Sequence, residues 1–377
     1  MKISCSQDLL ARGLNIVSRA AAPHSSLPVL GYILLHTDNG RLALSATNLQ
    51  VAMTCWIDAD VEEEGDIALH APTLVGVVNT LPQDQVELKL DDSTLNATIK
   101  SKHTETTLSG IRSQDFPAFQ KPTQEKRISL EARVLKQLIE QVAFAAAVDD
   151  SRPLLTGVLT NVDGAHIRMV AADGFRLSMR SAPISEGADQ NLSKTIPAHS
   201  LMEVAGLINN DLEEVYLSFS EEPDMVSFEL GDVLLQTILI DGSYPEFNSI
   251  VPTEYSTRTV LPAADFCEAC KTVAVLARNS DNLALVRLVE DDEASPAYAV
   301  VAAESAELGH NEARIDASME GSESEFGVNI NHLIEALKVI NTSQVALEIT
   351  SPGAPIAVKP VGENDFVQVI LPVHIGR

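Results

Sequence analysis

A pattern of two short strands joined by a polar turn occurs three times in this sequence, and each copy follows a helix with the same spacing of apolar residues. The paired strands are predicted at residues 86–99, 215–230 and 345–358. Apolar and polar residues alternate within each strand, which is typical of strands with one buried face. Repetition on this scale indicates equivalent domains placed side by side.

Each repeat contains two predicted helices. The second helix directly precedes the hairpin and has apolar residues at i, i+3, i+4 and i+7, which predicts one buried face. These residues are Leu74, Val77, Val78 and Leu81, then Leu201, Val204, Ala205 and Ile208, then Leu333, Ala336, Leu337 and Ile340. An earlier helix is predicted at 9–19, 130–146 and 264–278, and strand-like runs such as 41–56 and 166–179 lie between the helices. We therefore predict an α+β chain of three similar domains, each with two helices and antiparallel sheets, at residues 1–122, 128–252 and 253–377.

The charge of the chain is strongly acidic but unevenly distributed. With 26 basic and 53 acidic residues the formal net charge is −27. This charge argues against nucleic-acid binding, because proteins that bind nucleic acids usually carry a basic surface. The six predicted helices nevertheless carry basic and acidic residues in equal number, so the acidic excess lies in strands and loops. Their basic residues are Arg12, Arg19, Arg133, Lys136, Lys271, Arg278 and Lys338. By itself this balance does not identify a partner, since mixed charge is common on helices.

Two features could suggest metal chemistry. Cys267 and Cys270 form a C-x-x-C pair, but Cys5 and Cys55 lack the spacing of a second zinc-binding pair, so we predict buried core cysteines. The acidic groups Asp149–Asp150 and Glu290–Glu293 leave a metal-dependent nuclease as an alternative function. Neither group has a histidine or glycine frame suited to catalysis, and no phosphate-binding or hydrolase motif is present. We expect no metal, no cofactor and no catalytic residue.

The sequence also argues against secreted proteins, membrane proteins and adhesion modules. The N-terminal sequence lacks the basic and apolar regions of a signal peptide, and no apolar run is long enough to cross a membrane. We expect a cytoplasmic protein. A β-rich adhesion module is disfavoured by this location and by the two helices in each repeat.

Several motifs resemble one family in the same order. The segment Ala171–Leu177, A-A-D-G-F-R-L, resembles the A-T-D-G-H-R-L signature of the bacterial DNA polymerase III β subunit, the replicative sliding clamp. The segments L-P-V-L at 27–30, D-F-P at 115–117, D-G-S-Y-P at 241–245 and L-P-V-H-I at 371–375 resemble further motifs of that family. The resemblance covers the whole chain.

The resemblance implies a DNA clamp fold in which two three-domain protomers form a head-to-tail homodimeric ring. Helices line the hole, sheets form the outer layer, and duplex DNA is encircled without sequence-specific contacts. The implied function is non-catalytic: the ring confers processivity on the catalytic subunit of DNA polymerase III. The implied partners also include the clamp loader, other polymerases and repair proteins, which dock through short peptide motifs.

The resemblance also implies a hydrophobic pocket for these peptides between the second and third domains. By position, its walls are Leu155, Ala172, Gly174, Phe175, Arg176, Leu177, Pro245, Ser249, Ile250, Val369, Ile370, Leu371, Pro372, Val373, His374 and Ile375. Ala172 replaces the family's threonine, Phe175 its histidine, and Ser249 and His374 its arginines. These departures predict a less polar pocket with retained docking and altered specificity, so a divergent accessory clamp is a second alternative.

Other residues are implied to face DNA or the partner subunit. The DNA-facing set comprises the helix cations above together with His24 and Arg152 on loops. We expect these loops to contact DNA more weakly than in typical members, and an ion pair of Arg152 with Asp149 or Asp150 is equally consistent with the sequence. The subunit interface is expected at Thr106 and Leu108 in the first domain and at Val275 and Leu276 in the third.

Overall fold

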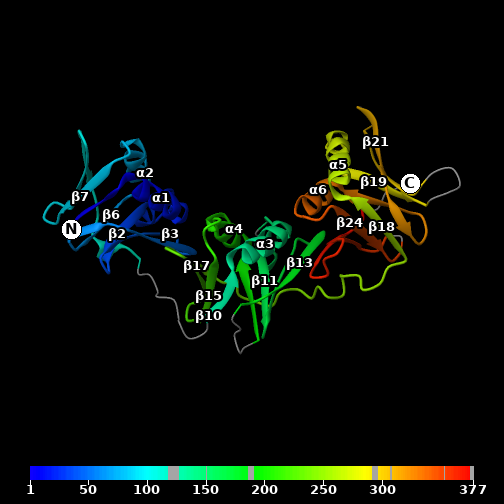
Figure 1. Cartoon of the computed structure of the whole chain (residues 1–377), viewed down its shortest axis with the longest axis horizontal. Helices are drawn as coiled ribbons and strands as arrows, with labels where there is room; N and C mark the ends of the chain where they lie inside the picture. The colour runs from blue at the N-terminus through cyan, green and yellow to red at the C-terminus, as the bar shows by residue number, and fades with distance from the viewer. Residues whose placement is uncertain are drawn as a thin grey trace. The chain divides into compact units, whose positions relative to one another are not determined.

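The described strands form antiparallel sheets, and helices pack against them (Figure 1). The chain divides into two units. The computed structural model describes residues 1–117, 127–149, 151–185, 191–290, 296–305, 308–351 and 353–373. Unit 1 consists of Met1–Arg133, Ser185–Ala188 and Glu203–Leu239, and unit 2 of Val134–Ile184, Asp189–Met202 and Ile240–Arg377. No helix of the described residues is long and apolar enough to span a membrane.

Unit 1 contains a five-stranded and an eight-stranded sheet. Its strands are β1 Lys2–Ser6, β2 Tyr32–Asp38, β3 Arg41–Thr47, β4 Val51–Ile57, β5 Asp60–Glu63, β6 Asp66–His70, β7 Gln85–Asp91, β8 Asn96–Ser101, β9 Thr104–Ser109, β10 Arg127–Glu131, β15 Glu214–Glu221, β16 Asp224–Leu230 and β17 Val233–Ile238. The strand orders are β5-β1-β7-β8-β9 and β10-β15-β16-β17-β4-β3-β2-β6. The helices α1 Gln7–Val17 and α2 Ala71–Thr80 pack against each other.

The eight-stranded sheet joins strands from two of the predicted repeats. β4 belongs to the first repeat and β17 to the second, and they pair antiparallel from Val51↔Thr237 to Cys55↔Val233. Backbone hydrogen bonds therefore continue across a boundary of the sequence repeat. For this reason unit 1 extends beyond the first repeat.

Unit 2 contains a nine-stranded and a four-stranded sheet. Its strands are β11 Gly157–Asp163, β12 His166–Ala172, β13 Arg176–Pro183, β14 Leu192–Pro197, β18 Thr257–Pro262, β19 Leu283–Val289, β20 Tyr298–Ser305, β21 Gly309–Asp316, β22 Ser318–Glu320, β23 Ser324–Asn329, β24 Gln344–Ile349, β25 Ile356–Pro360 and β26 Phe366–Ile370. The orders are β14-β11-β12-β13-β26-β25-β24-β18-β22 and β21-β20-β19-β23. Here β13 of the second repeat pairs with β26 of the third, so this sheet also continues from one repeat to the next.

All six predicted helices are present in the described chain. The remaining four are α3 Ala132–Val142, α4 Ala198–Leu207, α5 Ala263–Ala277 and α6 Ile330–Lys338. The range predicted for α3, 130–146, was too long. Leu130 belongs to β10, where it pairs with Val215, and the last turn is the 3-10 helix η4, Ala143–Ala145. The three predicted hairpins are confirmed as β7–β8, β15–β16 and β24–β25.

Local sequence signals explain where two of the helices begin. The hydroxyl oxygen of Ser6 accepts a hydrogen bond from Leu9 N–H at 3.3 Å at the start of α1. The side chain of Asn329 accepts one from Asn331 N–H at 3.0 Å at the start of α6. Such caps satisfy backbone donors that have no partner within the helix. Cys267 and Cys270 lie buried on α5, as predicted, and burial raises the pKa of Cys270 above its ordinary value.

Candidate functional site

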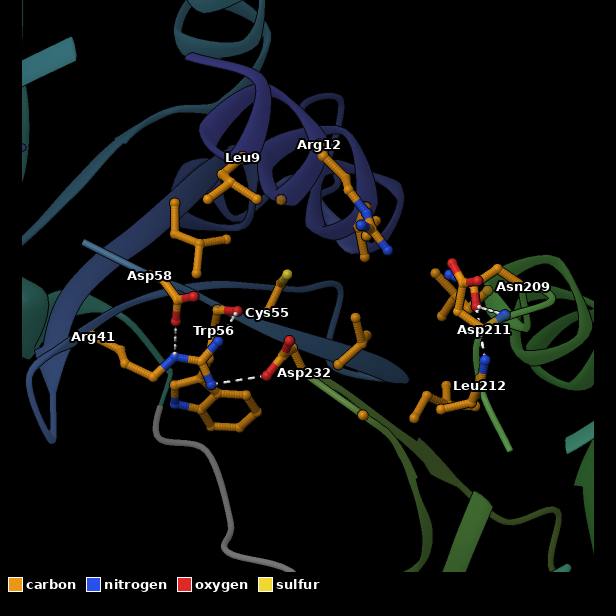
Figure 2. A pocket seen from close by; sticks show the side chains of 17 residues that line it. Leu9, Arg12, Arg41, Cys55, Trp56, Asp58, Asn209, Asp211, Leu212 and Asp232 are labelled. Carbon is orange, nitrogen blue, oxygen red and sulfur yellow. Dashed lines mark hydrogen bonds and ion pairs between the residues drawn. The ribbon is translucent and has the colours of Figure 1, made fainter. Parts of the chain in front are cut away.

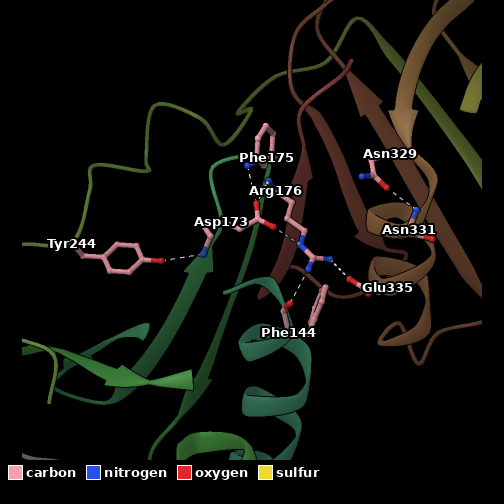
Figure 3. Close-up of polar contacts among 9 residues, drawn as sticks. Phe144, Asp173, Phe175, Arg176, Tyr244, Asn329, Asn331 and Glu335 are labelled. Carbon is pink, nitrogen blue, oxygen red and sulfur yellow. Dashed lines mark hydrogen bonds and ion pairs between the residues drawn. The ribbon is translucent and has the colours of Figure 1, made fainter. Parts of the chain in front are cut away.

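The A-A-D-G-F-R-L segment forms the tight turn between β12 and β13 (Figure 3). One carboxylate oxygen of Asp173 accepts hydrogen bonds from the backbone N–H groups of Phe175 at 2.8 Å and Arg176 at 2.9 Å. Gly174 has φ +94°, a conformation that glycine adopts without strain. The Asp-Gly pair therefore determines the local conformation, and Phe175 remains 62% exposed at the tip of the turn.

The guanidinium of Arg176 is held by three acceptors (Figure 3). Nε donates to the second oxygen of Asp173 at 3.1 Å, and Nη2 donates to the carbonyl oxygen of Phe144 at 3.0 Å. Nη1 donates to the carboxylate of Glu335 on α6, and the guanidinium also lies 5.2 Å from the centre of the Phe144 ring. Only 12% of the Arg176 side chain is exposed. Arg176 thus ties the turn to η4 and to α6.

The C-terminal strand lies directly beside this turn. In the ladder between β13 and β26, Arg176 pairs with Ile370 and Leu177 pairs with Val369. The backbone N–H of Leu371 donates to the carbonyl oxygen of Phe175 at 2.9 Å. Leu177 and Val369 are buried in one apolar cluster, which includes Phe247. The structure therefore brings together the two segments that the resemblance assigned to one pocket.

The segment after β17 completes this region. The side-chain oxygen of Tyr244 accepts a hydrogen bond from the backbone N–H of Ala172 at 3.0 Å, and burial raises the pKa of Tyr244 to about 12. Pro245 and Ser249 are exposed, and Ile250 N–H donates to Phe247 carbonyl oxygen at 3.0 Å. Tyr244 and Glu335 support the turn but were absent from our predicted set. The S-Y-P motif was a signal for Tyr244, whereas no local signal indicated Glu335.

The remaining predicted pocket residues differ in their exposure to solvent. Leu155 and Pro372 are half-buried, and Val373 is 43% exposed. Val373 N–H donates to the carbonyl oxygen of Gly327 at 2.9 Å. His374 and Ile375 lie outside the described residues.

Arg152 lies at this turn as well. A methyl group added to Gly174 would come within 2.6 Å of Arg152 Nη1, so the guanidinium lies against the bare backbone of Gly174. The carboxylate of Asp149 accepts hydrogen bonds from the backbone N–H of Ser151 at 3.0 Å and from its hydroxyl at 2.5 Å. These hydrogen bonds, and to a smaller extent the positive charge of Arg152, lower the pKa of Asp149. Asp150 lies outside the described residues. The proposed contact of Arg152 with DNA stays a prediction.

Arg12 lines a separate pocket of about 230 Å³ within unit 1 (Figure 2). At the opposite wall, Arg41 donates to Asp232 at 2.8 Å and to the carbonyl oxygen of Trp56 at 3.0 Å, and its Nε lies 3.1 Å from Asp58. Arg41 and Asp232 come from neighbouring repeats. This ion pair therefore reinforces the continuous sheet at the junction of β4 and β17.

The other predicted DNA-facing residues lie on accessible surfaces. Arg19 is 3.3 Å from Glu203, and Arg133 is 2.8 Å from Glu131. Lys136 is half-buried and has a partner of its own. The other members, His24, Lys271, Arg278 and Lys338, are exposed.

The predicted interface residues lie at or near sheet edges. Thr106 and Leu108 are half-buried on β9, an edge strand of the five-stranded sheet. Val275 and Leu276 lie on α5, which packs against the edge strand β21, and Val275 is 64% exposed. Among the described residues, no group of three His, Cys, Asp or Glu side chains is placed to hold a metal ion.

Comparisons with known proteins agree over the whole chain. Models of the DNA polymerase III beta subunit match residues 1–120 with the N-terminal domain, 129–246 with the central domain and 248–374 with the C-terminal domain. Beta sliding clamps of Synechocystis sp. and Bacillus subtilis are 29% and 26% identical to the chain, which they match over 100% and 99% of its length and 100% of their own.

Two solved structures are also similar to the chain over its whole length. The beta subunit from DNA polymerase of Streptococcus pyogenes has a TM-score of 0.93 at 25% identity. The DNA polymerase sliding clamp of Bacillus subtilis has the same TM-score and identity. Both comparisons cover 100% of each chain.

Proposed function

This chain belongs to the family of the DNA polymerase III β subunit, and we propose that it is a sliding clamp that encircles duplex DNA and tethers the polymerase. The observation that carries this proposal is the continuation of one repeat into the next by strand pairing, β4 with β17 and β13 with β26. When the last repeat of one copy meets the first repeat of another, such an assembly closes into a ring if the rotation from repeat to repeat completes a circle.

The same pairing supports a head-to-tail homodimer. β9 follows the hairpin of the first repeat as β17 and β26 follow those of the second and third, and β21 corresponds to β4 and β13. In the described sheets β9 and β21 are both edge strands, so each has one row of backbone groups available for a partner strand. We infer that β21 of one protomer pairs with β9 of its partner, which would bury Thr106, Leu108, Val275 and Leu276.

Sequence-independent binding suits this charge distribution. A ring retained by topology needs only weak phosphate contacts, since strong ones would hinder movement along the duplex. Helices with balanced charge would line the hole, while the acidic excess would lie on the sheets and loops. The proposed role is non-catalytic and cytoplasmic, and it requires neither a metal nor a cofactor.

The turn at Asp173–Phe175 and the C-terminal strand are proposed to receive short peptides from partner proteins. These would be the DNA polymerase III catalytic subunit, the clamp loader, other polymerases and repair proteins. Buried apolar anchors contribute roughly 1.5–3 kcal/mol each, less the cost of ordering the peptide. Binding of this strength is exchangeable, which allows several partners to share one ring.

The experiment that tests the clamp function is retention on DNA. Protein loaded onto nicked circular DNA is passed through a sizing column at high salt, before and after the circle is cut at one site. A ring is retained on the circle and lost after linearisation, because it slides off the ends. Equal loss from both forms of DNA would contradict the proposal.

A further inference from the structure

We propose that the pocket of unit 1 between α1 and the junction of β4 with β17 binds a free α-amino acid with a large apolar side chain. Arg12 would hold the carboxylate of this ligand, and Asp211 would hold its ammonium group. The site is distinct from the turn at Asp173–Phe175 and is independent of the proposed clamp function.

The two junctions between repeats are built from corresponding elements. The side chain of Asn48 accepts hydrogen bonds from the backbone N–H groups two and three residues later, at 2.9 Å and 2.7 Å, and Asp173 does the same in the second repeat. The residues that follow them, Leu49 and Gly174, both have positive φ. The helices α1 and α3 both have 11 residues. Residues at equal positions along these elements can therefore be compared between the two junctions.

Large side chains fill the second junction. The guanidinium of Arg180 donates to the side chain of Gln141, whose amide nitrogen donates to the carbonyl oxygen of Val339 at 2.7 Å. The same guanidinium lies 5.4 Å from the centre of the Phe366 ring, on the residue that pairs with Arg180 across the ladder. Smaller residues stand at the positions of Gln141, Arg180 and Phe366 in the first junction, namely Ile16, Cys55 and Val233. These three residues line the pocket of about 230 Å³.

Most of the pocket wall is apolar (Figure 2). Its apolar residues include Leu9, Ile16, Trp56 and Leu212. Burial raises the pKa of Cys55 to about 11, so this thiol is neutral near pH 7 and adds to the apolar lining. The volume is smaller than the roughly 300–1,000 Å³ of pockets for drug-sized ligands. A small molecule with an apolar body therefore fits this space.

The charged groups of the pocket define the rest of the ligand. Arg41 lies 2.8 Å from Asp232 and 3.1 Å from Asp58, so its charge is already compensated. In the described part of the chain, no ion pair engages the guanidinium of Arg12 or the carboxylate of Asp211, and these two groups do not pair with each other. Because two arginines and three aspartates line the pocket, a simple anion would meet an excess of negative charge. A ligand with one carboxylate and one ammonium group compensates both free charges.

The test measures the binding of L-leucine to the full-length protein. Trp56 lines the pocket and is the single tryptophan of the chain, so its fluorescence reports occupancy, and equilibrium dialysis with labelled leucine measures binding independently. Two further probes each lack one charged group: leucinamide lacks the carboxylate, and isocaproate lacks the ammonium group. We expect saturable binding of leucine, about three- to tenfold tighter than that of either probe, as contacts between charged groups at a partly exposed site predict.

Three variants and a control test the assigned residues. Arg12→Gln is expected to abolish the preference for leucine over leucinamide, and Asp211→Asn the preference for leucine over isocaproate. Val233→Phe introduces the residue type of the second junction and should weaken the binding of leucine about tenfold or more, because it fills the pocket. Asp8→Asn is the control, since Asp8 is exposed on α1 outside the pocket lining, and it should bind leucine as the parent protein does. Thermal unfolding monitors the folding of each variant.

Several outcomes would overturn the assignment of this pocket. If leucine shows no saturable binding below about 10 mM in either assay, the pocket is not an amino-acid site. If leucinamide or isocaproate binds as tightly as leucine, or if Arg12→Gln and Asp211→Asn retain the preference for leucine, the ligand is not held by these two charges. If Val233→Phe binds leucine as the parent protein does, the ligand lies elsewhere. Retention on circular DNA tests the clamp function separately from all of these outcomes.

Discussion

At the scale of single residues, the turn at Asp173–Phe175 combines a fixed backbone with an adaptable surface. Asp173 and Gly174 determine the backbone, while Phe175 remains exposed. Buried groups around the turn are held by specific partners, of which Tyr244 and Glu335 come from distant parts of the sequence. The residues that position the site are therefore different from the residues that would contact a ligand.

Gly174→Ala separates conformational strain from ligand contact. We expect a loss of about 1–2 kcal/mol in unfolding free energy, because alanine is strained at φ +94°. The new methyl group would also displace Arg152 Nη1, which it would otherwise meet at 2.6 Å. Gly164→Ala is the matched control, since φ is +55° there and the added methyl group meets nothing within 4 Å. Both variants should lose similar stability, and only Gly174→Ala should alter peptide affinity; equal peptide affinities would contradict this account.

His332 predicts a dependence of stability on acid pH. Its pKa is lowered from 6.5, first by burial and then by the charge of Arg176, and the carboxylates of Asp173 and Glu335 oppose this shift only in part. The unfolded chain therefore takes up a proton more readily than the folded chain, so the stability contribution is present above pH 6.5 and is lost as the pH falls below it. The free energy of unfolding, measured by chemical denaturation at pH 7.5 and at pH 5.5, should fall more between these two values for the parent protein than for His332→Gln. His24→Gln, at an exposed position, is the control and should behave as the parent protein does.

At the scale of elements, the chain separates two tasks between helices and strands. The strands carry the connection from repeat to repeat through the pairs β4–β17 and β13–β26. The helices present accessible cations, such as Lys271 and Arg278 on α5 and at its C-terminal end. Under the proposed function, this division would keep the sheets continuous and leave the cations of the helices available for contact with DNA.

Helix cations should affect DNA binding more than strand cations. For binding to a short primed duplex, removal of one phosphate-binding cation lowers the slope of log affinity against log salt by about 0.9. We expect Arg278→Gln and Lys271→Gln each to reduce the slope by up to this amount. Lys100→Gln is the control, because Lys100 lies on β8 and pairs with Glu105 at 3.0 Å. An equal reduction in the control would show that the helices have no special role.

At the scale of the whole molecule, the proposed ring depends on edges that remain open in one chain. β9 and β21 end their sheets in the described structure, whereas the equivalent strands of the other repeats are paired. An unprotected edge invites association with another chain. Dimerisation through these edges would complete the pattern that the two internal junctions begin.

A charge placed beside the open edge should prevent this association. Val275→Glu introduces a carboxylate at a position that is 64% exposed, so the fold should be retained, while burial of this charge in an interface would be costly. We expect the variant to sediment as a monomer at concentrations at which the parent protein is a dimer. Met202→Glu on α4, where the side chain is 47% exposed, is the control and should remain dimeric. If both variants remain dimeric, the subunit interface does not include Val275.

The sequence by itself determined the three repeats, the six helices, the hairpins and the Asp-Gly turn, because these follow from local patterns of burial and backbone conformation. The same patterns misplaced the ends of α3, since Leu130 suits either a helix or a strand and its pairing with Val215 decides between them. Only the tertiary structure decided that β4 pairs with β17, that Glu335 binds Arg176, and that Arg152 lies on Gly174. An alternating pattern specifies which face of a strand is buried but not which strand lies at its edge. Likewise, a charged residue shows that it needs a partner but does not reveal which distant residue the fold will bring to it.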